Sequence, residues 1–164
     1  MRTLLLLRHA KAEPADHDME DIARALTSRG HDDSLQVGDW LKKSALIPDA
    51  IITSTATRAR QTAEDVAESC GFLHPLQFHS DLYLAEPEVY LHLLRGWADD
   101  ESIVLMVGHN DGIEQLVSSL CGSSQVMQTA SLAHLRFPWT EWGQATLSAA
   151  GVLVELWRPE HRPH

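Results

Sequence analysis

Three short apolar runs alternate with segments of helical spacing, and this alternation limits the possible folds more than any other feature of the sequence. The runs at 4–7, 50–53 and 103–107 have strand length and are bounded by polar residues or glycine. Continuous apolar runs of this kind are typical of parallel strands that are covered on both faces. The sequence therefore predicts a single α/β domain of three layers, with a mostly parallel central sheet flanked by helices.

Weaker signals complete the predicted elements. Thr27 or Ser28 is a candidate N-cap for the first helix, and Thr57 for the second, which Gly71 is expected to end. Further strands are predicted at 76–78, 131–137 and 152–157. Helices are predicted after each of the two caps, running towards Lys43 and Gly71, then from Pro87 to Trp97, and after His109 to near Gly122.

One domain accounts for nearly the whole chain. The 164 residues suit a single hydrophobic core, and no low-complexity linker or internal repeat divides them. We expect this domain to span residues 1–158. Residues 159–164, which include two prolines and two histidines, are expected to form a disordered tail.

The charge of the chain excludes several classes of protein. A formal net charge of −10 argues against a general nucleic-acid binder, which needs a basic face, and against docking on an anionic membrane. Any phosphate site must therefore be a local basic pocket on an acidic body.

The apolar run at 4–7 is too short for a signal peptide, so we expect a cytoplasmic protein. Cys70 and Cys121 are interpreted as structural thiols.

Basic side chains and histidines follow three of the predicted strands. Arg8 and His9 follow the run at 4–7, and His109 follows the run at 103–107. Arg58 lies in the first turn of the helix after the run at 50–53. Ligands of open α/β sheets bind beyond the carboxyl ends of the strands, and a helix N-terminus with an arginine favours phosphate. The pattern indicates an anion site, although each residue taken alone is more often an ordinary surface or hydrogen-bonded residue.

The same three segments resemble a known family. Leu7-Arg8-His9-Ala10 is similar to the Arg-His-Gly/Ala signature of the histidine phosphatase superfamily, whose fold is phosphoglycerate mutase-like. The stretch from Ser54 to Ala63 resembles the second motif of that family, and Val107-Gly108-His109-Asn110 resembles the third. The order and spacing agree over essentially the whole chain.

Within the superfamily, the SixA-type phosphohistidine phosphatase branch fits the short chain best. The segment Arg24-Ala25-Leu26-Thr27-Ser28-Arg29-Gly30 resembles the Arg-Pro-Leu-Thr-x-x-Gly segment of that branch, with Ala25 in place of the proline. The resemblance implies that His9 is the nucleophile and becomes phosphorylated. It also implies that Arg8, Arg58 and His109 hold the phosphoryl oxygens, and Arg24 is a further candidate for substrate binding.

The resemblance does not by itself identify a general acid. Many members of the superfamily carry a carboxylate after the second motif, and Glu86 is the candidate at that position. The alternative is that Glu86 and Glu88 only favour the N-terminus of a helix. A phosphohistidine substrate needs less help, because neutral imidazole is a good leaving group.

The sequence thus predicts a phosphatase that works through a phosphohistidine intermediate and acts on phosphohistidine in a signalling or phosphotransfer protein. Two alternatives stay open: a small-molecule phosphomonoesterase of the same superfamily, and a phospho-binding module without turnover. We expect phosphate or a similar anion in the site, and no cofactor. No metal is expected, since the ten histidines show no zinc-binding pattern. The oligomeric state is left open.

Overall fold

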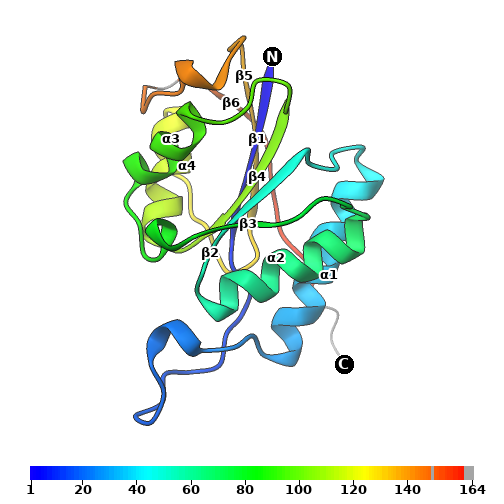
Figure 1. Ribbon diagram of the computed structural model, residues 1–164, viewed down its shortest axis with the longest axis vertical. Coiled ribbons are helices and arrows are strands. Elements are labelled where there is room, and N and C mark those ends of the chain that lie inside the picture. Colours follow the sequence, from blue (N-terminus) through cyan, green and yellow to red (C-terminus); the bar gives the residue numbers. More distant parts are fainter. Residues whose placement is uncertain (149, 161–164) are drawn as a thin grey trace.

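A six-stranded sheet forms the centre of the molecule. Figure 1 shows the computed structural model, which describes residues 1–148 and 150–160. The strand order is β3-β2-β4-β1-β5-β6. The four strands from β3 to β1 are parallel, whereas β5 runs antiparallel to both of its neighbours. The strands are β1 (Arg2–Arg8), β2 (Ala50–Ser54), β3 (Gln77–His79), β4 (Ile103–Gly108), β5 (Leu132–Phe137) and β6 (Val152–Trp157).

Helices cover both faces of the sheet, which confirms the predicted three-layer α/β domain (Figure 1). The helices α1 and α2 pack on one face and α3 and α4 on the other. Three short 3-10 turns lie between the longer elements: η1 (Asp21–Ala23), η2 (Ser80–Leu82) and η3 (Trp142–Gln144). The helices are α1 (Ser28–Lys43), α2 (Thr57–Cys70), α3 (Pro87–Arg95) and α4 (Gly112–Cys121).

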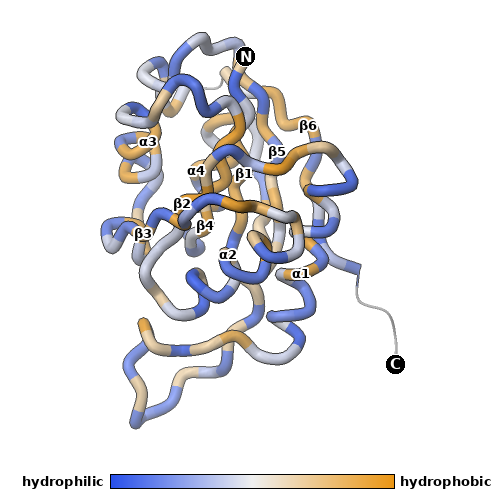
Figure 2. Tube along the Cα trace, turned by 45° about the vertical axis from the view of Figure 1, so that its right-hand side comes forward, coloured by the Kyte–Doolittle hydropathy of each residue, from blue (hydrophilic) through white to orange (hydrophobic). Residues whose placement is uncertain are grey.

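The leucine run in β1 explains why both faces need helices. Leu4 and Leu6 join the core under α3 and α4, while Leu5 and Leu7 join the core under α1 and α2. All four side chains are fully buried. Burying one such side chain is worth about 1.5–3 kcal/mol, so a solvent-exposed face on this strand would be costly. Figure 2 shows hydrophobic, orange stretches along the central strands and more hydrophilic stretches in the helices and loops around them.

The helix ends follow the sequence in part. Thr27 caps α1, and its hydroxyl oxygen accepts a hydrogen bond from the backbone N–H of Gly30 at 3.0 Å. The cap of α2 is Ala56 rather than the predicted Thr57, which is the first residue of the helix. The backbone N–H of Ala56 instead donates to the hydroxyl of Ser54 at 3.2 Å. Gly71 ends α2 in the left-handed conformation (φ 79°), as predicted.

The C-terminal tail and possible membrane-spanning helices are the remaining features to consider. Residues 161–164 of the predicted disordered tail lie outside the described residues, so that assignment stays a prediction. Within residues 1–148 and 150–160, no helix has both the length and the apolar character needed to cross a membrane.

Candidate active site

The two histidines of the sequence motifs lie side by side at one edge of the sheet. The strands β1 and β4 are parallel neighbours, with Arg8 in register with Gly108. The backbone N–H of His9 continues this pairing by donating to the Gly108 carbonyl at 3.0 Å. The ring centroids of His9 and His109 are 5.2 Å apart, and the residues are 7% and 1% exposed. The carboxyl ends of β1, β2 and β4 meet at this edge (Figure 1).

Two arginines reach the same edge from different elements. Arg8 is the last residue of β1, and Arg58 is the second residue of α2 and only 2% exposed. Arg8 Nη1 donates to the Met127 carbonyl at 3.0 Å, which fixes that guanidinium against the protein. The Nε atoms of both arginines are buried and have no hydrogen-bond partner within the described part of the chain. Buried guanidinium donors of this kind fit a phosphate or another oxyanion.

The hydrogen bond of His9 defines which ring nitrogen is available for chemistry. His9 Nδ1 lies 2.7 Å from the carbonyl oxygen of Ala10. A carbonyl only accepts, so Nδ1 carries the proton and Nε2 carries the lone pair. Burial, together with the charges of Arg58, Arg8 and Arg24, lowers the pKa of His9 to about 4. The ring is therefore neutral at neutral pH, with Nε2 free to act as a nucleophile.

His109 is held by two hydrogen bonds. Its Nε2 lies 2.8 Å from the hydroxyl of Ser54, at the end of β2, and its backbone N–H donates to the Tyr90 hydroxyl at 3.2 Å. A Cβ atom at Gly108 would lie only 2.0 Å from that hydroxyl, so glycine is needed at this position. Burial, then the neighbouring His9 and Arg58, lower the pKa of His109 to about 3. His109 Nδ1 is buried and has no partner among the described residues.

The two remaining candidates differ in their relation to the site. Arg24 is close enough for its charge to lower the pKa of His9, although its Nε and Nη1 donate to Asp21 and to the carbonyl of Glu13. Glu86 precedes α3 and is exposed. Its Cα lies 3.6 Å from the Cβ position that a side chain at Gly112 would occupy, so the backbone of Glu86 borders the start of α4. The structure brings Arg24 into the cluster and leaves Glu86 at its border.

Sequence reasoning missed Asp21, Tyr83 and Ser54, which belong to this cluster. Asp21 accepts hydrogen bonds from Arg58, Arg24 and the Tyr83 hydroxyl, and Ser54 contacts His109. Asp21 lies in a polar loop with several acidic residues and no periodic pattern, so nothing in the sequence distinguishes it from its neighbours. Ser54 is the first residue of the quoted second motif, which is the one signal that pointed to it.

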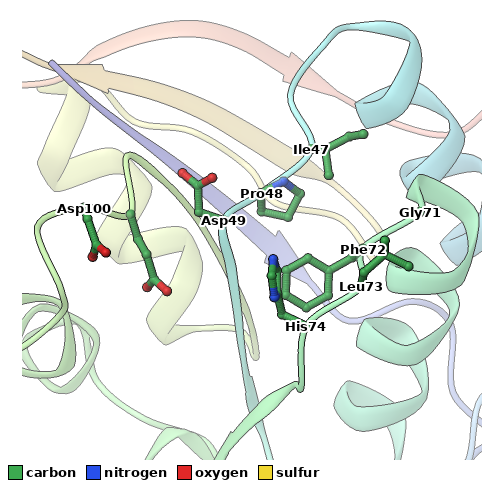
Figure 3. A pocket seen from close by; sticks show the side chains of 9 residues that line it. Ile47, Pro48, Asp49, Gly71, Phe72, Leu73, His74 and Asp100 are labelled. Carbon is green, nitrogen blue, oxygen red and sulfur yellow. The ribbon is translucent and has the colours of Figure 1, made fainter.

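A separate pocket of about 400 Å³ lies away from this cluster. Figure 3 shows side chains from the α1–β2, α2–β3 and α3–β4 connections around it, among them Asp49, Phe72 and His74. It adjoins the amino end of β2, whereas His9 and His109 lie at the carboxyl ends of the strands.

Among the described residues, no group of three or more His, Cys, Asp or Glu side chains is arranged to hold a metal, and metal independence stays a prediction.

The depressed pKa values of the two histidines predict a loss of stability in mild acid. Between the unfolded pKa of 6.5 and the folded values of about 4 and 3, the unfolded chain takes up protons that the folded chain does not. Each histidine therefore costs up to about 1.4 kcal/mol of folding free energy per pH unit as the pH falls below 6.5. Urea unfolding at pH 7 and pH 5 measures this loss. The His109→Gln variant should show a smaller loss, and an equal loss in both proteins would contradict the pKa shift.

Comparison with known proteins is consistent with the geometry. A family model described as histidine phosphatase superfamily (branch 1) matches residues 4–86. An uncharacterised protein of Mycobacterium tuberculosis is 33% identical over 157 residues, which cover 92% of this chain and 91% of that protein. The phosphohistidine phosphatase SixA of Escherichia coli is 30% identical over 135 residues, covering 78% and 80% of the two chains.

A solved structure shows the same fold. The crystal structure of a SixA protein from Agrobacterium tumefaciens superposes with a TM-score of 0.82 and 25% identity, covering 96% of this chain and 98% of that one. The family match spans half of the present sequence, and the relatives align over most of their own length. On these grounds the chain belongs to the histidine phosphatase superfamily, branch 1.

Proposed function

We propose that this phosphatase removes the phosphoryl group from phosphohistidine in another protein, with His9 as the nucleophile. The observation that carries the proposal is the state of His9: a buried, neutral imidazole whose Nδ1 donates to the Ala10 carbonyl and whose Nε2 lone pair is available. The name of the E. coli relative, phosphohistidine phosphatase, supports the choice of substrate.

In the first step, His9 Nε2 attacks phosphorus and the P–N bond of the substrate breaks. The electron pair of that bond stays on the substrate nitrogen, and because the other ring nitrogen of the phosphohistidine carries a proton, the substrate histidine leaves as neutral imidazole. His9 then carries the phosphoryl group on Nε2 and keeps its proton on Nδ1, so that the ring is positive and remains hydrogen-bonded to Ala10. In the second step, water attacks phosphorus and the P–Nε2 bond breaks. The protons of the water leave with the phosphate, and His9 returns to its neutral form.

Positioned cations are the main source of rate in such a transfer. The transferring phosphoryl group carries its charge on three equatorial oxygens, so that catalysis rests on positioning and electrostatic stabilisation. Arg8 and Arg58 offer their buried Nε donors for this purpose, and Arg24 adds a third nearby charge.

A phospho-binding module without turnover would need only the arginines. Rapid mixing with a phosphodonor separates the two functions, because only the enzyme forms acid-labile phosphate on His9.

The acid–base properties of the nearby carboxylates favour a leaving group that needs no proton. The carboxylate that contacts Arg58 belongs to Asp21, whose pKa is lowered to about 2 chiefly by the Tyr83 hydroxyl and by the two arginines. It is ionised at neutral pH and has no proton to donate. An imidazole leaving group has a conjugate acid of pKa about 6.5 and departs without enzymatic protonation, whereas an alkoxide does not.

A small-molecule phosphomonoesterase is the second candidate, and the position of Glu86 beside the start of α4 is what favours it.

We expect Glu86→Gln to change the rate on a phosphohistidine protein by no more than about twofold, because no proton is required there. If Glu86 is a general acid for esters, the same change should lower the ester rate by about 10²–10⁴-fold. Rates on both substrates, with Glu88→Gln as a matched control, distinguish the functions. Glu88 is a neighbouring carboxylate that is paired with Arg95. A large loss on the phosphohistidine substrate would contradict the leaving-group argument.

A further inference from the structure

One carboxylate joins three elements around the proposed phosphoryl site. Asp21 lies in η1, within the long connection from β1 to α1. Its Oδ2 accepts hydrogen bonds from Arg58 Nη2 at 3.0 Å and from the Tyr83 hydroxyl, and its Oδ1 accepts from Arg24 Nε at 3.0 Å. These partners come from α2, from the segment after η2, and from the same connection as Asp21.

The contacts with Arg58 leave a defined part of its guanidinium free. Arg58 Nη1 donates to the backbone carbonyl of Asp21 at 2.8 Å, and Nη2 donates to the side chain of Asp21. Both terminal nitrogens are therefore held by one residue, while Nε is buried and has no partner within the described ranges. Because the guanidinium is planar, fixing its two terminal nitrogens also fixes the direction of the Nε–H bond. Arg58 is close enough to His9 and His109 to lower both pKa values.

The connection that carries Asp21 is itself closed at its base. The backbone N–H of Glu13 donates to the Ala25 carbonyl at 2.8 Å, and that of Thr27 donates to the Lys11 carbonyl at 2.9 Å. Asp21 thus projects from an anchored loop onto the side chain of Arg58, which is only 3% exposed. The interaction is charge-assisted and largely out of water at the arginine end, where such hydrogen bonds are strongest.

We propose that Asp21 is a positioning residue: it holds Arg58 and Arg24 in the orientation that the transferring phosphoryl group requires, and so couples the β1–α1 loop to catalysis. This proposal rests on phosphoryl transfer at His9 as described above. The carboxylate does not touch the reacting atoms and has no proton to transfer. Its effect on the rate acts through the two arginines.

The Asp21→Asn variant tests this role, with Asp18→Asn as its matched control. Both changes remove one negative charge from the same loop, but Asp18 is exposed and its carboxylate has no hydrogen bond or ion pair among the described residues. We expect Asp21→Asn to lower kcat on a phosphohistidine protein by about 10–100-fold, the loss typical of a misplaced catalytic group. KM should change little, and Asp18→Asn should keep the wild-type rate.

Two inhibitors separate positioning from a general loss of structure. Vanadate takes the geometry of the transferring phosphoryl group, so its inhibition should weaken in parallel with kcat. Sulfate binding depends on the positive charge of the site rather than on the transition-state geometry. Sulfate should therefore bind Asp21→Asn at least as tightly as wild type, because a nearby negative charge has been removed. A variant whose fold is damaged should lose both.

The effect of Asp21→Asn in the wild type is also compared with its effect in an Arg58→Ala protein. In an Arg58→Ala protein, adding Asp21→Asn should cost much less than it does in the wild type, because one of the two arginines that Asp21 positions is gone and only its contact with Arg24 is left to lose. An equal loss in the two backgrounds, or a rate for Asp21→Asn equal to that of Asp18→Asn, would overturn the proposal. A wild-type protein without phosphatase activity would instead overturn the proposed function.

Discussion

The His9→Ala variant is expected to lose phosphatase turnover by about 10⁴-fold or more, because no other group can form the covalent intermediate. His9 is the buried imidazole whose Nε2 carries the free lone pair at the edge of the sheet. His109 should not replace it, since its Nε2 is already engaged with the Ser54 hydroxyl at 2.8 Å and its Nδ1 is buried away from solvent. Steady-state hydrolysis of a phosphohistidine protein measures the loss. Rapid quenching shows whether acid-labile phosphate still forms on the protein.

The fold should survive this change, and a second buried histidine provides the control. His134 is 9% exposed and lies within β5, in register with Leu5 of β1 and therefore away from the carboxyl edge. The His134→Ala variant also deletes a buried imidazole, but it should keep most of the activity. Substantial turnover by His9→Ala, or an equal loss in the two variants, would contradict the assignment of His9 as nucleophile.

The sequence predicts the sheet well because its signals are local. The leucines at 4–7 and the apolar run at 103–107 have no polar face, so each must be covered on both sides wherever it lies in the fold. That requirement alone predicts β1, β4 and the layers around them, and the residues after both strands then meet at one edge. The placement of His9 beside His109 follows from the pairing of β1 with β4.

What the sequence does not predict depends on contacts between distant segments. Asp21 reaches Arg58 across 37 residues and Tyr83 across 62 residues, through a loop that has no hydrophobic period. The segment around Trp139 and Trp142 gives no strand or helix pattern, yet both indoles pack into the core, where Trp142 donates from its indole N–H to the Glu101 carbonyl at 2.7 Å. Ala56 replaces Thr57 as the cap of α2 because the end of β2 supplies the hydroxyl of Ser54. In each case the partner, rather than the residue itself, determines the structure.

Arg58 should be the most sensitive of the proposed anion-binding residues. We expect Arg58→Ala to lower kcat/KM on a phosphohistidine protein by about 10²–10³-fold, the loss typical of one preorganised donor to a developing charge. The same change removes a partner of Asp21, so the pKa of that carboxyl should rise from about 2 towards its ordinary value. Arg60→Ala is the matched control, because Arg60 lies on the same helix, is exposed and pairs with Glu64.

The Arg58→Lys variant then tests whether charge alone is enough. Lysine has a single nitrogen and cannot donate to the backbone carbonyl of Asp21, to its carboxylate and to the phosphoryl group in the fixed geometry of a guanidinium. We therefore expect Arg58→Lys to lose nearly as much rate as Arg58→Ala, while sulfate inhibition recovers because the positive charge is restored. Wild-type turnover in Arg58→Lys would show that a point charge is sufficient, and that the paired contacts between Arg58 and Asp21 have no part in positioning the phosphoryl group.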